Sequence, residues 1–144
     1  MPMALAIGVI LSHALMASDQ PAVFKEVTQM VDGWQPDQHL YVRGNLGVSE
    51  KSLDSLEKWL DENGKNWTVV FMSNANDQSW KDTRGVSYYG MDAVENAVGR
   101  GLANNEKFAS MVDGSDGKQN GAIFVLFLEE RKFSYFGEEV YDVR

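Results

Sequence analysis

The chain has 144 residues, which is long enough for one domain with a substantial hydrophobic core. Its 13 basic and 21 acidic side chains give a formal net charge of −8, which argues against binding to the phosphate backbone of a nucleic acid. The absence of cysteine excludes disulfides, thiolate zinc sites and thiol nucleophiles, and two histidines are a poor supply for a catalytic triad.

Residues 1–18 form an apolar segment that contains no Asp, Glu, Lys or Arg. Its apolar run and the small residues near Ala17 are typical of an export signal, although the basic start of such a signal is missing. The alternatives are an apolar helix packed on the domain or on a partner, and a short membrane span interrupted by polar residues. We expect an exported or lumenal protein, with a membrane-associated N-terminus as the closest alternative.

Residues 19–38 are predicted to form an N-terminal helix and a connector. Ser18 or Asp19 can start the helix before Pro21, and Gly33 can end it. The apolar residues between these ends have helical spacing; they are Val23, Phe24, Val27, Met30 and Val31. A short strand is then predicted in "HLYVR", residues 39–43.

Ser49 is predicted to cap a helix that ends at Gly64. The apolar stripe of this helix consists of Leu53, Leu56 and Leu60. Two later segments, residues 67–73 and 122–128, are apolar at almost every position. Such segments are typical of strands covered on both faces, so we expect them to be neighbours at the centre of a sheet.

Asp92 and Glu95 resemble a capping box at the start of a further helix. Its apolar stripe consists of Met91, Val94, Val98 and Leu102. Two glycines, Gly99 and Gly101, weaken this helix, and we expect a break before "NNEKFASMV". A charged turn after residue 128 leads into "FSYF", which is predicted to pair with strand 122–128 as a hairpin.

These elements predict an α/β fold: a mixed β-sheet of about four strands, with helices on both faces and a C-terminal β-hairpin. The alternation of strands and helices favours parallel pairing of the first three strands, and the last strand adds an antiparallel partner. The apolar N-terminal segment precedes this sheet.

Two stretches, "VSEKSLDSLEKWLDENGKNWTVVFMS" and "GKQNGAIFVLFLEERKFSYFGEE", resemble the TPM domain, and the likeness covers roughly residues 40–140. Its most specific part is Asn120-Gly121, the apolar strand, Arg131-Lys132 and Gly137. The resemblance implies a mixed sheet between helices. It also implies a TPM-like domain in residues 39–144, in which we expect the family's C-terminal helix to be missing.

Members of this family include thylakoid-lumen proteins, a photosystem II repair factor, bacterial exported proteins and a receptor modulator. The resemblance therefore implies a location in the thylakoid lumen or the periplasm and an association with membrane complexes. Acid phosphatase activity and calcium binding have been attributed to some members, so the resemblance implies both as possible properties of this chain.

Only oxygen ligands are plentiful, so a metal site in this chain would hold Ca²⁺ or Mg²⁺. Asp113 and Asp116 precede strand 122–128, and Glu138 and Glu139 follow its hairpin partner, so the four carboxylates are expected at one end of the hairpin. The loop "DGSDG" matches neither an EF-hand nor a phosphate-binding loop. A turn-rich connector without a cofactor is the simpler interpretation, and a Ca²⁺ or Mg²⁺ site is the alternative.

Trp80, Tyr88 and Tyr89 lie in or beside a polar loop. They either form an interaction surface or fold back over the helices. Trp59 and Trp67, by contrast, are predicted to lie in the core rather than to bind a ligand.

Glu129 and Glu130 form the acidic tip of the predicted hairpin. The tip is either solvated or a docking point for a basic partner, and the solvated tip is the simpler interpretation. At the same end of the sheet we expect Asp77 and Ser49, because ligands of open α/β sheets bind at the carboxyl ends of the parallel strands.

Two functions from different classes remain. The first is a non-catalytic, extracytoplasmic accessory domain that associates with a membrane-protein complex, for example in photosystem assembly or repair. The alternative is a metal-dependent acid phosphatase, in which the bound ion neutralises the phosphoryl oxygens and orients water. That route would depend on Asp113, Asp116, Glu138 and Glu139.

Overall fold

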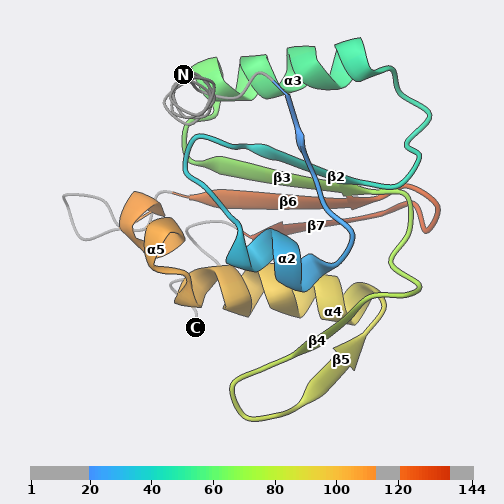
Figure 1. Ribbon diagram of the computed structural model, residues 1–144, viewed down its shortest axis with the longest axis vertical. Coiled ribbons are helices and arrows are strands. Elements are labelled where there is room, and N and C mark those ends of the chain that lie inside the picture. Colours follow the sequence, from blue (N-terminus) through green and yellow to red (C-terminus); the bar gives the residue numbers. More distant parts are fainter. Residues whose placement is uncertain (1–19, 113–120, 137–144) are drawn as a thin grey trace, which may run out of the picture.

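The computed structural model describes residues 20–112 and 121–136, and Figure 1 shows one sheet between layers of helices. The sheet has the strand order β1-β2-β3-β6-β7. These strands are β1 (Ala22–Val23), β2 (Leu40–Arg43), β3 (Trp67–Met72), β6 (Ala122–Phe127) and β7 (Lys132–Phe136). The first four pair in parallel, and β6 and β7 pair antiparallel, so the predicted mixed α/β sheet with a C-terminal hairpin is confirmed.

The two apolar segments predicted to be central neighbours are β3 and β6. They pair in parallel along their whole length, from Trp67 opposite Ala122 to Met72 opposite Phe127. Their inward side chains alternate with outward ones, and Val70, Ile123 and Val125 are fully buried. The prediction that both faces of these strands are covered is only half right, because the outward side chains of β6 are half-buried.

The fifth strand arises where the sequence predicted the start of a helix. Ala22 and Val23 are extended and pair with β2, and the Phe24 N–H donates to the Val42 carbonyl. Helix α2 (Val27–Asp32) begins only after Glu26, whose side chain forms a capping box with Gln29. The predicted start at Ser18 or Asp19 is therefore wrong: Pro21 precedes a strand, and Val23 is 78% exposed at the sheet edge.

One face of the sheet is covered by α2 and by a longer helical segment (Figure 1). This segment begins as α4 (Met91–Asn96), widens into a π-helical turn (Ala97–Gly101) and tightens into a 3₁₀ turn (Leu102–Asn104). Helix α5 (Glu106–Val112) follows it. The predicted break before the last segment is confirmed, since Asn105 is extended and separates the 3₁₀ turn from α5.

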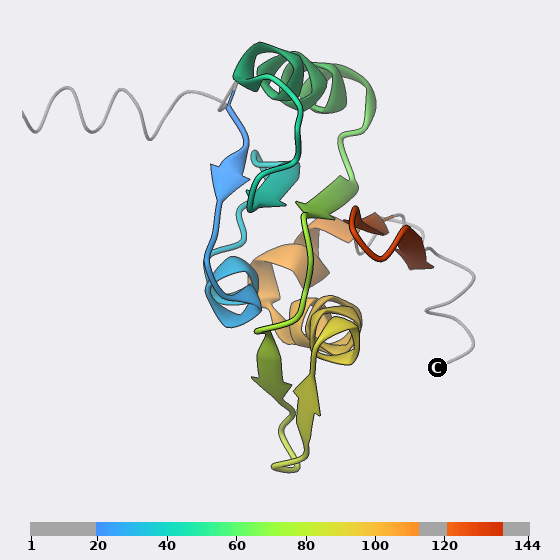
Figure 2. The same cartoon turned by 90° about the vertical axis from the view of Figure 1, so that its right-hand side faces the viewer.

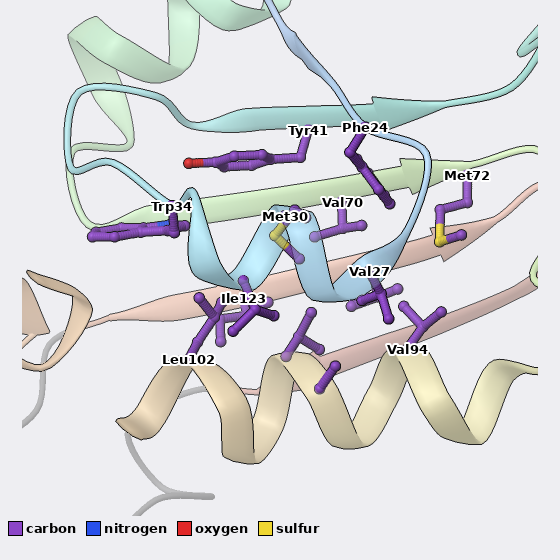
Figure 3. Packing of buried hydrophobic residues seen from close by; sticks show 14 of the residues in the cluster. Phe24, Val27, Met30, Trp34, Tyr41, Val70, Met72, Val94, Leu102 and Ile123 are labelled. Atoms are coloured by element: carbon purple, nitrogen blue, oxygen red, sulfur yellow. The ribbon is translucent and has the colours of Figure 1, made fainter. Parts of the chain in front are cut away.

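The main core lies between this helical layer and the sheet. Figure 3 shows α2 and the α4 segment pointing apolar side chains at β3 and β6. Val94, Val98 and Leu102 are fully buried and form the predicted stripe, whose four-residue spacing continues through the π turn. The predicted capping box is wrong, because Gly90 occupies the N-cap position and Asp92 lies in the first turn.

A short antiparallel hairpin, β4 (Ser79–Lys81) with β5 (Ser87–Tyr89), connects β3 to α4. Figure 2 shows it projecting beyond the helical layer, at the opposite end of the molecule from α3. No helix within residues 20–112 or 121–136 has the length and apolar character needed to cross a bilayer.

Helix α3 (Glu50–Asn63) covers the other face of the sheet, and a buried carboxylate fixes its position. Glu57 is fully buried. Its Oε1 accepts hydrogen bonds from the His39 N–H (2.9 Å) and the Gln38 side chain (3.1 Å), and its Oε2 accepts one from the Leu40 N–H (2.6 Å). The helix is thereby tied to the first residues of β2.

The stripe of α3 therefore differs from the predicted one. Leu60 is buried and Leu53 is partly buried, but Leu56 is 37% exposed, and Glu57 takes the inward position between them. Burial raises the pKa of Glu57, although the N–H groups of His39 and Leu40 act in the opposite direction by hydrogen bonding to the ionised form.

Removal of this carboxylate is expected to loosen α3 from the sheet. Glu57→Ala leaves two buried N–H groups without an acceptor and should lower the free energy of unfolding by roughly 3–5 kcal/mol in chemical denaturation. Glu57→Gln keeps one oxygen and should cost about half as much. The exposed Glu62→Ala on the same helix is the control, with an expected change within about 0.5 kcal/mol. Equal losses for Glu57→Ala and Glu62→Ala would show that the Glu57 carboxylate does not hold α3 on the sheet.

The same carboxylate predicts the sign of a pH effect. Because the folded-state pKa of Glu57 is raised, the folded protein binds more protons than the unfolded chain between the two pKa values. The difference in unfolding free energy between wild type and Glu57→Gln should therefore fall as the pH rises through that window. At pH values above this window the difference in unfolding free energy should be constant. A difference that grows with pH would show that the pKa of Glu57 is lowered instead.

Candidate functional site

Five aromatic side chains form a continuous strip on the α3 side of the sheet. We call this set the aromatic strip; its members are Trp59, Trp67, Phe124, Phe133 and Tyr135. Ring centroids along it lie 6.3 Å apart for Trp59–Trp67 and 5.6 Å for Trp67–Phe124. Phe124 then contacts Tyr135 at 5.1 Å and Phe133 at 6.5 Å, so the strip runs from α3 to the edge strand β7.

Strand register explains the alignment of these rings. Phe124 on β6 lies opposite Tyr135 on β7, and Phe133 lies opposite Leu126, so all four side chains point to the same face of the sheet. Exposed fractions along the strip are high for aromatic residues: 61% for Phe133 and 49% for Tyr135.

The strip is open because α3 covers only the other half of this face. Figure 2 shows α3 above β2 and β3, whereas no helix of the described residues lies above β6 and β7. Leu60 and Leu53 pack with Leu40 and Val42 of β2, which places Trp59 on the flank of the helix. The prediction that Trp59 and Trp67 are core residues is wrong, since they are 49% and 37% exposed.

A second feature lies at the other end of the molecule, between the β4–β5 hairpin and the α4 segment. It is an open cavity of about 810 Å³, which is within the usual size of a small-molecule site. Its walls include the charged side chains of Asp82, Arg84, Glu95 and Arg100.

Asp82 organises the loop that joins β4 to β5. Its Oδ1 accepts from the N–H groups of Arg84 and Val86, each at 2.9 Å, and its Oδ2 accepts from the Arg84 guanidinium at 2.9 Å and the Tyr88 hydroxyl at 3.2 Å. Partial burial acts in the other direction, but these hydrogen bonds lower the pKa of Asp82 to about 2. Asp82 is therefore ionised at any physiological pH.

Two glycines in the π turn shape the wall next to this loop. The sequence predicted that Gly99 and Gly101 weaken the helix, but at the glycines themselves the chain continues as a wider turn, and the break comes later, at Asn105. A Cβ at Gly101 would lie 3.1 Å from Val31 Cγ1 and 3.5 Å from the Trp80 ring. Glycine therefore allows α2 and Trp80 to approach the turn that carries Arg100.

The structure does not bring all three residues of the predicted aromatic site, Trp80, Tyr88 and Tyr89, together. Trp80 and Tyr88 are opposite each other on β4 and β5, stack at 5.9 Å and fold back towards the α4 segment. Trp80 packs against the main core and lines the cavity, whereas Tyr89 is 71% exposed. The structure thus brings two of the three together and leaves the third outside.

The two glutamates at the tip of the β6–β7 hairpin also differ in their exposure. Glu129 is exposed, while Glu130 is half-buried and its Oε1 accepts from the Ala75 N–H at 3.3 Å. Asp77 forms an ion pair with Arg43 at 2.6 Å, and Ser49 caps α3 through the Ser52 N–H. Hydrogen bonding by Gln78 and the charge of Arg43 lower the pKa of Asp77, so it serves as a structural partner of these groups.

The four carboxylates predicted to bind Ca²⁺ or Mg²⁺ lie outside the described residues. They are Asp113, Asp116, Glu138 and Glu139. Among residues 20–112 and 121–136, no group of three or more histidine, aspartate or glutamate side chains has the arrangement of a metal site. Metal binding by this chain therefore stays a prediction.

No family model, curated protein or solved structure matches this chain. The likeness to the TPM domain accordingly stays an expectation drawn from the sequence.

The Asp82 network predicts how the β4–β5 hairpin responds to acid. A lowered folded-state pKa stabilises the hairpin above the ordinary pKa of an aspartate, and this stabilisation is lost as the pH falls towards 2. The backbone N–H signals of Arg84 and Val86 should titrate with a midpoint near 2 in NMR spectra. At neutral pH, Asp82→Asn should accelerate hydrogen exchange of the Val86 N–H, whereas the exposed Asp92→Asn should not. A midpoint in the ordinary aspartate range would contradict the network.

Proposed function

We propose that this protein is a non-catalytic accessory domain that docks through its aromatic strip onto an apolar-faced helix of a membrane-protein complex. The observation that carries the proposal is the half-covered face of the sheet, where rings that contact one another remain exposed. Contiguous apolar patches of this kind are typical of interaction sites, whereas single exposed apolar residues are ordinary.

The width of the uncovered area matches one helix. Neighbouring strands are about 4.8 Å apart and packed helices are about 10 Å apart, so each helix covers about two strands. On the opposite face α2 and the α4 segment lie side by side, whereas on this face α3 is the one helix of residues 20–112 and 121–136, and it lies above β2 and β3. The two uncovered strands, β6 and β7, therefore leave room for about one further helix.

The strip has the composition of an interface centre. Aromatic residues are enriched there because they bury a large area at a low cost in side-chain entropy. Trp59 forms one wall of the site and the rings of β6 and β7 form its floor, so a helix laid beside α3 would contact all of them. Burial of each exposed ring would contribute roughly 2 kcal/mol.

The choice of a membrane-protein complex rests on the sequence. Residues 1–18 are apolar and have the character of an export or membrane-facing segment, which would bring the domain to an extracytoplasmic membrane surface. The resemblance to the TPM domain supports the same location, in the thylakoid lumen or the periplasm. The metal-dependent phosphatase stays a prediction, and no contact among the described residues favours it.

Photocrosslinking can identify what covers the strip. A photoreactive phenylalanine analogue at Tyr135 in the full chain, expressed in cells with their native membranes, should crosslink to one face of a helix in a membrane protein. The same analogue at Tyr89, which lies outside the strip and is more exposed than Tyr135 (71% against 49%), is the control and should not form this crosslink. Crosslinks confined to residues 1–18 of the same chain, or to a second copy, would overturn the proposal.

Substitutions in the strip give the matching affinity measurement. The pair Phe133→Asp and Tyr135→Asp should weaken binding to the crosslinked partner at least a hundredfold, because two rings worth roughly 2 kcal/mol each are lost. Both side chains are about half exposed, so the fold should persist, as circular dichroism can verify. Tyr89→Asp should bind like the wild type. Unchanged affinity of the double variant would exclude the strip as the docking site.

A further inference from the structure

The cavity beside the β4–β5 hairpin contains two guanidinium groups that meet at one hydroxyl. Arg84 Nη2 lies 3.3 Å and Arg100 Nη1 lies 3.4 Å from the Tyr88 oxygen. Like charges this close repel each other, so their juxtaposition needs a nearby negative charge. The cavity lining also contains two carboxylates, Asp82 and Glu95, so its formal charge is balanced and the question is how closely each carboxylate pairs with an arginine.

Asp82 supplies that charge only in part. Both of its oxygens already accept hydrogen bonds from the loop backbone, Arg84 and Tyr88. Arg100 is 3.8 Å from Asp82 Oδ2, which is too long for a hydrogen bond. The other carboxylate lining the cavity, Glu95, forms no ion pair within 4.0 Å with either arginine in the described part of the chain.

Both arginines are accessible, and Arg84 is also held in place by Asp82. Their side chains are 65% and 52% exposed, and both residues line the cavity, so a ligand there has access to them. Arg84 is fixed by its bidentate contact with Asp82 Oδ2 through Nε and Nη2. Arg100 is carried on the π turn, a feature that often marks functional sites in helices.

The cavity also has an apolar part. Trp80 and Phe136 line it together with the arginines, and Trp80 is stacked on Tyr88 and supported by the main core. A ligand in this cavity would thus meet guanidinium donors and aromatic rings at the same time. Small-molecule sites commonly combine an apolar lining with a few polar groups that fix orientation.

We propose that this cavity binds a small organic anion, with its phosphate or carboxylate group between Arg84 and Arg100 and its apolar body against Trp80 and Phe136. The site is separate from the aromatic strip, whose members lie on the α3 side of the sheet, whereas this cavity lies between the β4–β5 hairpin and the α4 segment. Guanidinium groups favour phosphate and carboxylate because their donors match two oxygens at once.

Titration of isotope-labelled full-length protein with phenyl phosphate, followed by NMR, tests the proposal. Saturable shifts are expected for the Trp80 indole N–H and the side-chain N–H signals of Arg84 and Arg100. Benzoate in place of phenyl phosphate shows whether a carboxylate serves as well as a phosphate. Inorganic phosphate should bind more weakly than phenyl phosphate, and benzyl alcohol, which carries no charge, should not bind.

Arg100→Gln should weaken phenyl phosphate binding at least about tenfold, the loss expected for one charge-assisted hydrogen bond. Arg131→Gln, at an exposed arginine of the β6–β7 turn, is the matched control and should bind like the wild type. Equal shifts with benzyl alcohol, no saturable shifts with phenyl phosphate or benzoate, or an equal loss in both variants would each overturn the proposal.

Discussion

The buried carboxylate of Glu57 determines where α3 lies, and the position of α3 determines which part of the sheet stays open. By accepting the backbone N–H groups at the start of β2, it holds the helix over β2 and β3. His39 strengthens the same connection: its Nδ1 lies 3.0 Å from the Trp67 carbonyl, and its Nε2 lies 3.5 Å from Asp61 on α3. A helix fixed in this way cannot shift to cover β6 and β7.

The two proposed sites therefore lie on opposite faces of one sheet. The aromatic strip lies on the α3 side, whereas the arginine cavity lies between the α4 segment and the β4–β5 hairpin, which projects away from α3 (Figure 2). Binding at one face leaves the other accessible, so a docked domain could still take up a small anion. The sheet between them, in which β3 and β6 pair over six residues, supports both sites.

Two carboxylates show how environment sets the role of an acidic residue. Glu57 is buried, and its hydrogen-bond donors are two backbone N–H groups and an amide, so burial raises its pKa. Asp82 accepts from a guanidinium, a hydroxyl and two N–H groups, so its pKa falls to about 2. The first fixes a helix on a sheet. The second fixes a loop and holds Arg84 at the cavity.

Sequence by itself determined the α/β class, the parallel β2, β3 and β6, the hairpin and the stripe of α4, because these depend on local periodicity and on the alternation of strands and helices. It failed where several segments compete for one surface. Leu56 and Trp59 have the spacing of core residues, but only tertiary structure shows that Glu57 turns inward and that one helix cannot cover five strands. The sequence also did not predict that Arg84 and Arg100 meet at Tyr88. These residues belong to a hairpin and to a π turn, and no local sequence pattern indicates that the two segments contact each other.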